Sequence, residues 1–176
     1  AERGVAGATV GAVAERAGVS RGAAQHHFPT REDLFLAALG HMLDSRSTEL
    51  RRSATEVPEG AGRTEAVVGV VAEAFSSVEF QAALQLWASA ASDPTLRTHI
   101  VPMEERIGRE IHRTTVELLG VDESVAGARE TVQATLDLAR GLGLAHLLTD
   151  DTARRRRIVE QWARMLEREL DHQRRG

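Results

Sequence analysis

The stretch VSRGAAQHHF, residues 19–28, places three strongly hydrogen-bonding side chains close together: Arg21, Gln25 and His26. An arginine donates to phosphate oxygens or to guanine, and a glutamine pairs with adenine through two hydrogen bonds. A short helix that turns such side chains outward is suited to the phosphates and base edges of duplex DNA. The stretch therefore indicates nucleic-acid recognition.

The histidines raise other chemistries. His26 and His27 are adjacent, but neighbouring residues on a helix point about 100° apart and do not comfortably share one metal ion. His112 shares a helical face with Glu105 and Arg109, and this arrangement does not indicate a function for the histidine. The chain has no cysteine, no HExxH motif and no recognisable serine–histidine–aspartate grouping. We therefore predict no metal site, no cofactor and no catalytic residue; an enzyme would instead show turnover and a titrating pocket residue.

Two short helices are expected to position these side chains. Apolar residues at helical spacing predict a helix over residues 10–17, with Thr9 as N-cap and Gly18 as C-cap. Ser20 is the expected N-cap of a second helix that ends at Phe28.

The junction of these helices predicts how they pack. Ala14 is small enough for the second helix to cross closely, and Val19 is expected to fill the space between the two helices. Two short helices joined this tightly predict a helix-turn-helix, in which the second helix lies in the DNA major groove.

The remaining chain predicts helices only, because alternating β-branched runs are missing. Thr30 and Asp33 form a capping box that starts a helix to about Ser53. The loop over 54–62 separates a DNA-binding domain of residues 1–53, with its connecting helix, from a larger helical domain of residues 54–176. The helices expected there cover 63–76, 78–91, 94–100, 103–119, 123–148 and 152–172, with a break at Pro102. The fold class is all-α.

Charge is distributed unevenly along the chain. All 22 basic residues are arginines and the net charge is −4. Residues 1–52 carry a net charge of +1 and residues 53–176 one of −5, which permits DNA binding by the first domain. No apolar run approaches the roughly 20 residues of a membrane helix, and the absence of cysteine suits a reducing compartment. We expect a soluble, cytoplasmic protein with no membrane partner.

Residues 7–34, GATVGAVAERAGVSRGAAQHHFPTREDL, resemble the DNA-binding region of the tetracycline-repressor (TetR) family of bacterial transcriptional regulators. The match rests on residues 17–20 (Ala-Gly-Val-Ser), Gly22, residues 27–28 (His-Phe), Arg31 and Leu34. The resemblance implies binding to double-stranded operator DNA, with Thr9 and Arg31 on phosphates and with Arg21, Gln25 and His26 on base edges. It also implies that Gly22 permits close approach of the backbone and that His27 sits near the backbone.

Three departures from the family pattern bear on these roles. Gln25 stands where the family usually has a tyrosine that touches a phosphate, although glutamine can still donate a hydrogen bond or read adenine. Arg31 replaces a lysine and keeps its charge. The chain begins near the expected end of the family's first helix, so we expect that residues before Ala1 are missing from this sequence.

The last two predicted helices are apolar over a wide surface. Either this surface is core alone, or part of it meets a second copy. The resemblance favours a homodimer in which these helices pair across a two-fold axis, and this would place two reading helices about 34–36 Å apart, one DNA turn. The candidate interface residues are Leu136, Leu142, Ile158, Trp162, Met165 and Leu166.

The segment from Arg63 to Leu119 is the expected location of a small-molecule pocket, again by resemblance. Its candidate lining residues are Phe75, Phe80, Leu84, Trp87, Met103, Ile107 and Ile111. The alternative for each of them is an ordinary core position. Because the set is apolar, we expect a hydrophobic or amphipathic effector.

These observations predict a ligand-responsive repressor, in which the effector shifts the spacing of the two DNA-binding heads through the helix from Thr30 to Ser53. The alternative is an all-helical sensor or interaction protein that no longer binds DNA. Gln25 and the negative total charge favour that alternative.

Overall fold

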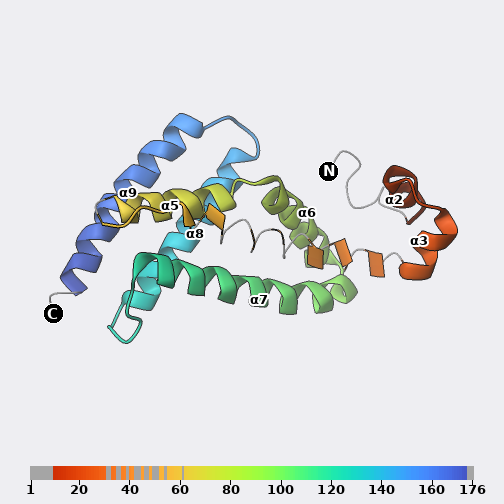
Figure 1. Ribbon diagram of the computed structural model, residues 1–176, viewed down its shortest axis with the longest axis horizontal. Coiled ribbons are helices and arrows are strands. Elements are labelled where there is room, and N and C mark those ends of the chain that lie inside the picture. The colour runs from red at the N-terminus through yellow and green to blue at the C-terminus, as the bar shows by residue number, and fades with distance from the viewer. Residues whose placement is uncertain are drawn as a thin grey trace. The chain divides into compact units, whose positions relative to one another are not determined.

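The computed structural model describes most of the chain. The described residues are 10–30, 33, 34, 37, 38, 40, 41, 45, 48, 52, 53, 55–60 and 62–173. Over this part the regular elements are seven helices and no strand, labelled as in Figure 1: α2 (Val10–Ala17), α3 (Arg21–His27), α5 (Arg63–Ala74), α6 (Val78–Ser92), α7 (Pro94–Leu119), α8 (Ala128–His146) and α9 (Thr152–Gln173). The predicted all-α fold class is confirmed.

Local hydrogen bonds set the turn between α2 and α3. Gly18 ends α2 in the left-handed conformation at φ 67°, as predicted, and the Val19 N–H donates to the Ala14 carbonyl at 3.0 Å. The Ser20 hydroxyl caps α3 by accepting a backbone N–H at 3.1 Å. Ala14 and Ala24 are buried where the helices pack. Val19 is 50% exposed, so the prediction that it fills this space is wrong: the two alanines already close the contact.

The predicted capping box after α3 is present. The Asp33 N–H donates to the Thr30 hydroxyl oxygen, and the Thr30 N–H donates to the Asp33 carboxylate, both at 3.0 Å. Hydrogen bonds from the Thr30 side chain and backbone hold the pKa of the Asp33 carboxyl below its ordinary value. The described residues between 33 and 55 are each helical; the predicted helix from Thr30 to Ser53 also covers residues outside the described part and stays a prediction.

A three-helix bundle forms the main core. Helix α5 packs against both α8 and α9, and α8 packs against α9 (Figure 1). The apolar faces that meet there supply most of its buried residues: Val67, Val68, Val71, Ala72, Val132, Leu136, Ala139, Leu142, Ala163, Leu166 and Leu170. The spacing of three and four residues within each helix is what places these side chains on one face.

Gly143 lets α8 approach the end of α5 very closely. A Cβ at position 143 would lie 1.8 Å from the Phe75 carbonyl oxygen and 3.1 Å from the Phe80 ring. Any side chain there would collide with backbone, so this crossing requires glycine.

Pro102 does not interrupt its helix, contrary to the prediction. Helix α7 runs without a break through Pro102, which removes only the hydrogen bond to the carbonyl of Thr98. Both residues are exposed, so water can solvate the freed carbonyl.

Helix α8 starts later than predicted, at Ala128 instead of residue 123. The Asp122 carboxylate accepts the Ser124 N–H at 2.9 Å and so forms a turn. Gly127 then adopts φ 84° immediately before the helix. This local turn chemistry delays the start that apolar spacing alone suggested.

Contacts divide the chain into two compact units. One comprises Ala1–Ser45 with Ala82–Glu104, and the other comprises Arg46–Gln81 with Glu105–Gly176. This division differs from the proposed domain boundary at residues 53 and 54, because α6 and α7 each contribute residues to both units.

Within the described residues, no helix taken singly has the length and apolar character needed to cross a membrane; only α5 and α6 taken together, bent by 53°, meet that test.

Candidate nucleic-acid and subunit interfaces

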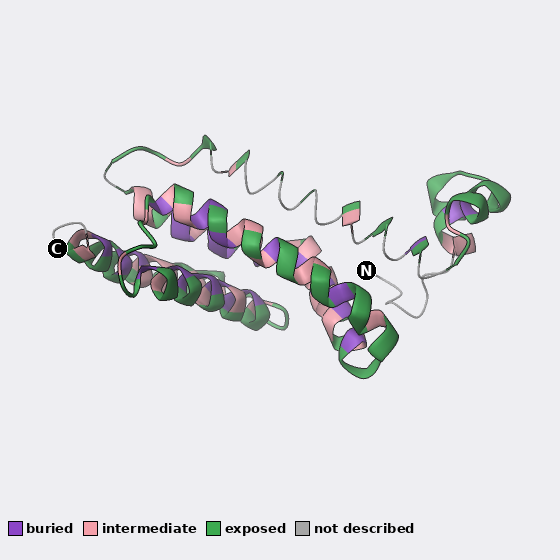
Figure 2. Cartoon of the chain, turned by 90° about the horizontal axis from the view of Figure 1, so that it is seen from below, coloured by how far each residue is buried: buried purple, intermediate pink, exposed green. Residues whose placement is uncertain are grey.

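Helix α3 turns a polar face outward. Ala24 is buried against α2, whereas Gly22, Gln25 and His26 are exposed. Gly22 and His26 are four residues apart and lie two positions to either side of Ala24, so they occupy the side of the helix opposite the contact with α2. Among the described residues, no atom apart from the chain neighbours and the backbone of α3 itself comes within 4 Å of a Cβ built on Gly22, so the helix surface is open there. Figure 2 shows α2 and α3 as exposed over most of their surface.

Arg21 lies beside this face and reaches α2. Position 21 is three residues before the buried Ala24, on the flank of α3 and not on its outermost side. A Cβ built on Gly11 would lie 3.6 Å from Nε, 3.8 Å from Cζ and 3.9 Å from Cδ of Arg21. The arginine side chain therefore folds back along α2 and passes over Gly11.

The adjacent histidines stand apart from each other. The ring centroids of His26 and His27 are 5.8 Å apart with planes at 69°, and His27 lies 6.4 Å from the Phe28 ring. The described part of the chain holds no group of three potential metal ligands. Thr9 and Arg31, the predicted phosphate contacts, lie outside the described residues.

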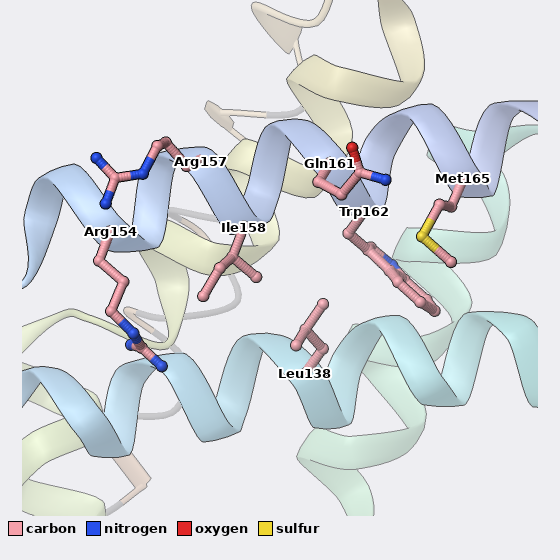
Figure 3. Close-up of a pocket in the computed structure, with 7 residues that line it drawn as sticks. All are labelled: Leu138, Arg154, Arg157, Ile158, Gln161, Trp162 and Met165. Atoms are coloured by element: carbon pink, nitrogen blue, oxygen red, sulfur yellow. The ribbon is translucent and has the colours of Figure 1, made fainter.

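A groove between α8 and α9 is the second notable surface. It encloses about 280 Å³ and is lined by Leu138, Arg154, Arg157, Ile158, Gln161, Trp162 and Met165. Figure 3 shows Ile158 and Leu138 pointing toward each other, with the Trp162 ring lying between the helices beside Met165. The indole N–H of Trp162 donates to the Thr135 hydroxyl at 3.1 Å, which fixes the ring at the edge of the groove.

Comparison with known proteins identifies the chain. Its residues 1–38 match the model of the bacterial regulatory proteins, tetR family. Over 163 residues it is 32% identical to the HTH-type transcriptional regulator CymR of Pseudomonas putida, covering 89% of this chain and 78% of that protein. The chain belongs to the tetR family. It is a helix-turn-helix, DNA-binding transcriptional regulator.

Other similarities of this tetR-family regulator agree. The HTH-type transcriptional regulator BetI of Burkholderia mallei (strain NCTC 10229) is 27% identical to it over 158 residues, covering 85% of this chain and 76% of that protein. The crystal structure of a transcriptional regulator from Rhodococcus sp. Rha1 matches its fold with a TM-score of 0.71 at 23% identity, covering 97% of this chain and 90% of that chain.

The residues predicted for a dimer interface fall into two groups. Ile158 and Trp162 are half-buried and Met165 is 49% exposed, so these side chains are open to a partner at the groove. The other three, Leu136, Leu142 and Leu166, are at most 5% exposed and belong to the regulator's core. They are therefore corrected to core positions, because α5 already covers the faces on which they lie.

Sequence reasoning missed four residues of the groove: Leu138, Arg154, Arg157 and Gln161. A signal for part of this set was present. Positions 154, 158, 161 and 165 follow helical spacing, but two of them, Arg154 and Gln161, are polar, so a search for apolar residues alone does not find the whole stripe.

The residues predicted for the effector pocket are distributed over both compact units. Phe75, Phe80, Ile107 and Ile111 belong to one unit, whereas Leu84, Trp87 and Met103 belong to the other. The first three are buried, the two phenylalanine rings meet edge to face at 5.1 Å, and the Arg140 guanidinium lies 5.3 Å above the Phe75 ring. These are contacts within the core of one unit. That all seven residues line one effector pocket stays a prediction.

His112 has a partner that the sequence did not suggest. The interpretation that it only shares a face with Glu105 and Arg109 is wrong: its Nε2 lies 2.8 Å from a carboxylate oxygen of Glu123, in the loop before α8. Hydrogen bonding to His112 and the charges of His112 and Arg129 hold the pKa of the Glu123 carboxyl below its ordinary value. Because the ionised carboxylate only accepts, Nε2 carries the proton.

Proposed function

We propose that this regulator is a ligand-responsive repressor that binds operator DNA as a homodimer. The observation that carries the DNA-binding part is the outward side of α3: Gly22 and His26 are exposed opposite the buried Ala24, and Gln25 is exposed on the flank beside them. In this proposal the protein has no catalytic role and works in the cytoplasm.

The proposed DNA contacts are divided by type. Gln25, His26 and Arg21 contact base edges, since α3 is the helix that enters the major groove. Gly22 permits the DNA backbone to approach, and His27 lies near that backbone. Thr9 and Arg31 hold phosphates and so fix the register of the head on the duplex.

Selection from a random pool of duplexes tests this part. The full chain is expected to enrich one sequence with two-fold symmetry, and its affinity for that duplex is expected to fall steeply as salt rises, because phosphate contacts release counterions. A sensor that no longer engages DNA would enrich no sequence and show no such salt dependence.

The proposed dimer forms through the groove side of α8 and α9. Along α8 the exposed small residues Ala134, Gly141 and Ala145 flank Leu138 at helical spacing, so a second helix can approach closely. Along α9 the apolar side chains of Ile158 and Met165 line the groove. A self-complementary face of this kind suits a two-fold axis.

A charge placed on this face tests the dimer. Met165→Glu is expected to convert a dimer to a monomer in light scattering after size-exclusion chromatography. Arg156→Gln changes the charge of α9 by the same amount at an exposed position on the side of the helix opposite Ile158 and Met165, and should leave the dimer intact. A monomeric wild-type chain, or equal effects of both variants, would contradict the proposed interface.

The proposed effector is hydrophobic or amphipathic, in keeping with the predicted apolar lining. It acts only if it binds one spacing of the two heads better than the other. Measuring operator affinity with and without each bound ligand checks this: demonstrable ligand binding that leaves operator affinity unchanged would refute the switch.

A further inference from the structure

We propose that Gly11 is a positioning residue for DNA recognition, because the guanidinium of Arg21 rests over it. This inference rests on the proposed function, since Arg21 is taken there as a DNA contact. It adds a residue on α2 that touches no DNA in the proposal and acts through another side chain.

The contact between the helices provides the geometry. Gly11 lies three residues before the buried Ala14, on the side of α2 that faces α3. A Cβ on Gly11 would point at the guanidinium, with Nε at 3.6 Å and Cζ at 3.8 Å. These are ordinary van der Waals distances, so a methyl group fits, but a longer side chain that extends from Cβ toward Arg21 would compete with the guanidinium for its space.

The consequence follows from the length of the arginine side chain. Arg21 begins α3 and is exposed, so several rotamers are open to it in the absence of a support. The contact with α2 selects one conformation of the Arg21 side chain and holds the guanidinium at one place, over Gly11 and on the flank of α3. A larger residue at position 11 would force Arg21 onto another path and misplace its donors.

A double-mutant cycle on the full chain tests this role, with fluorescence anisotropy on the selected duplex. Arg21→Ala and Gly11→Leu are each expected to weaken binding about tenfold, the size of one misplaced base contact. Gly11→Ala is the matched control and should stay within about twofold, because its Cβ fits. In the Arg21→Ala background, Gly11→Leu should cause no further loss.

Each outcome decides the question. The positioning role is refuted if Gly11→Leu leaves the affinity for DNA unchanged. It is also refuted if Gly11→Leu weakens binding equally with and without Arg21, which is the result expected if the substitution misfolds α2 and α3. If the wild-type chain shows no salt-dependent, sequence-preferring binding to DNA, the proposed function fails as a whole. That result differs from one in which the wild type binds DNA but the effects of the two substitutions simply add, which would refute the role of Gly11 alone.

Discussion

The helix-turn-helix head and the three-helix bundle use their side chains in opposite ways. In α2 and α3 the buried residues are Ala14 and Ala24, and nearly every other residue is exposed or half-exposed (Figure 2). In α5, α8 and α9 whole faces of valine, leucine and alanine are buried. The bundle therefore gains stability from apolar burial, whereas α2 and α3 depend on caps and tight turns.

This difference explains where functional side chains lie. A helix of seven residues has few positions, and α3 buries only one of them, Ala24, against α2. The rest stay available for a partner. The bundle has the reverse arrangement: most apolar residues of its faces are buried, and the groove of α8 and α9 is an open apolar surface, the one proposed above for a second subunit.

The variant with the largest expected effect destabilises the three-helix bundle and leaves α2 and α3 unchanged. Gly143→Ala places a methyl group 1.8 Å from the Phe75 carbonyl oxygen, which cannot move without shifting the end of α5. We expect a loss of about 3 kcal/mol or more in the free energy of unfolding. Urea denaturation followed by circular dichroism measures it.

Gly69→Ala is the control for that variant. Position 69 is on α5, and in the described part of the chain a Cβ there meets no atom within 4 Å apart from its chain neighbours and the helix's own backbone. Because alanine favours helix over glycine, this variant should gain about 0.5–1 kcal/mol. Equal losses in both variants would show that the close approach at Gly143 is not the cause.

A polar contact inside the bundle gives the next effect. Thr135→Val removes the acceptor of the Trp162 indole N–H and leaves that donor half-buried without its bond. The expected loss is about 1–3 kcal/mol in the free energy of unfolding. Thr131→Val, which removes only a bond to the Gly127 carbonyl, should cost clearly less; the same cost in both would argue against a special role for the indole bond.

A change in the head should leave the bundle unaffected. Ser20→Ala removes the side-chain cap of α3, worth about 1 kcal/mol of local helix stability. We expect weaker duplex binding and faster amide exchange in α3, with the exchange of α5, α8 and α9 unchanged. Ser20→Asp, which can also cap, should restore both properties.

The smallest effect concerns pH. Because its pKa is lowered in the folded chain, the Glu123 carboxyl contributes stability above its ordinary pKa of 4.5, and this contribution is lost as the pH falls through the lower folded value. Wild type should therefore lose more stability than Glu123→Gln as the pH falls from about 6, above the ordinary pKa of 4.5, to about 3. Thermal melts over this range check it, with Glu130→Gln as the control at an exposed position.

Sequence reasoning succeeded where structure depends on neighbours in the chain. The caps at Ser20 and Asp33 and the stop at Gly18 follow from turn chemistry over three or four residues. It failed at Pro102, where exposure to water made the missing hydrogen bond tolerable, and at the start of α8, where Asp122 formed a turn. For the site, it selected the exposed residues of α3 but assigned three core leucines to the dimer face.

By itself, the sequence determined the all-helical class, the helix-turn-helix and the family, since each depends on spacing and caps within a short stretch. Only the tertiary structure decided which side of each long helix is covered. It placed Leu136, Leu142 and Leu166 in the core, left the groove of α8 and α9 open, and laid Arg21 over Gly11. The reason is that an apolar stripe in the sequence predicts that one face of a helix is buried, but it does not predict which other helix covers that face. That depends on how the helices pack.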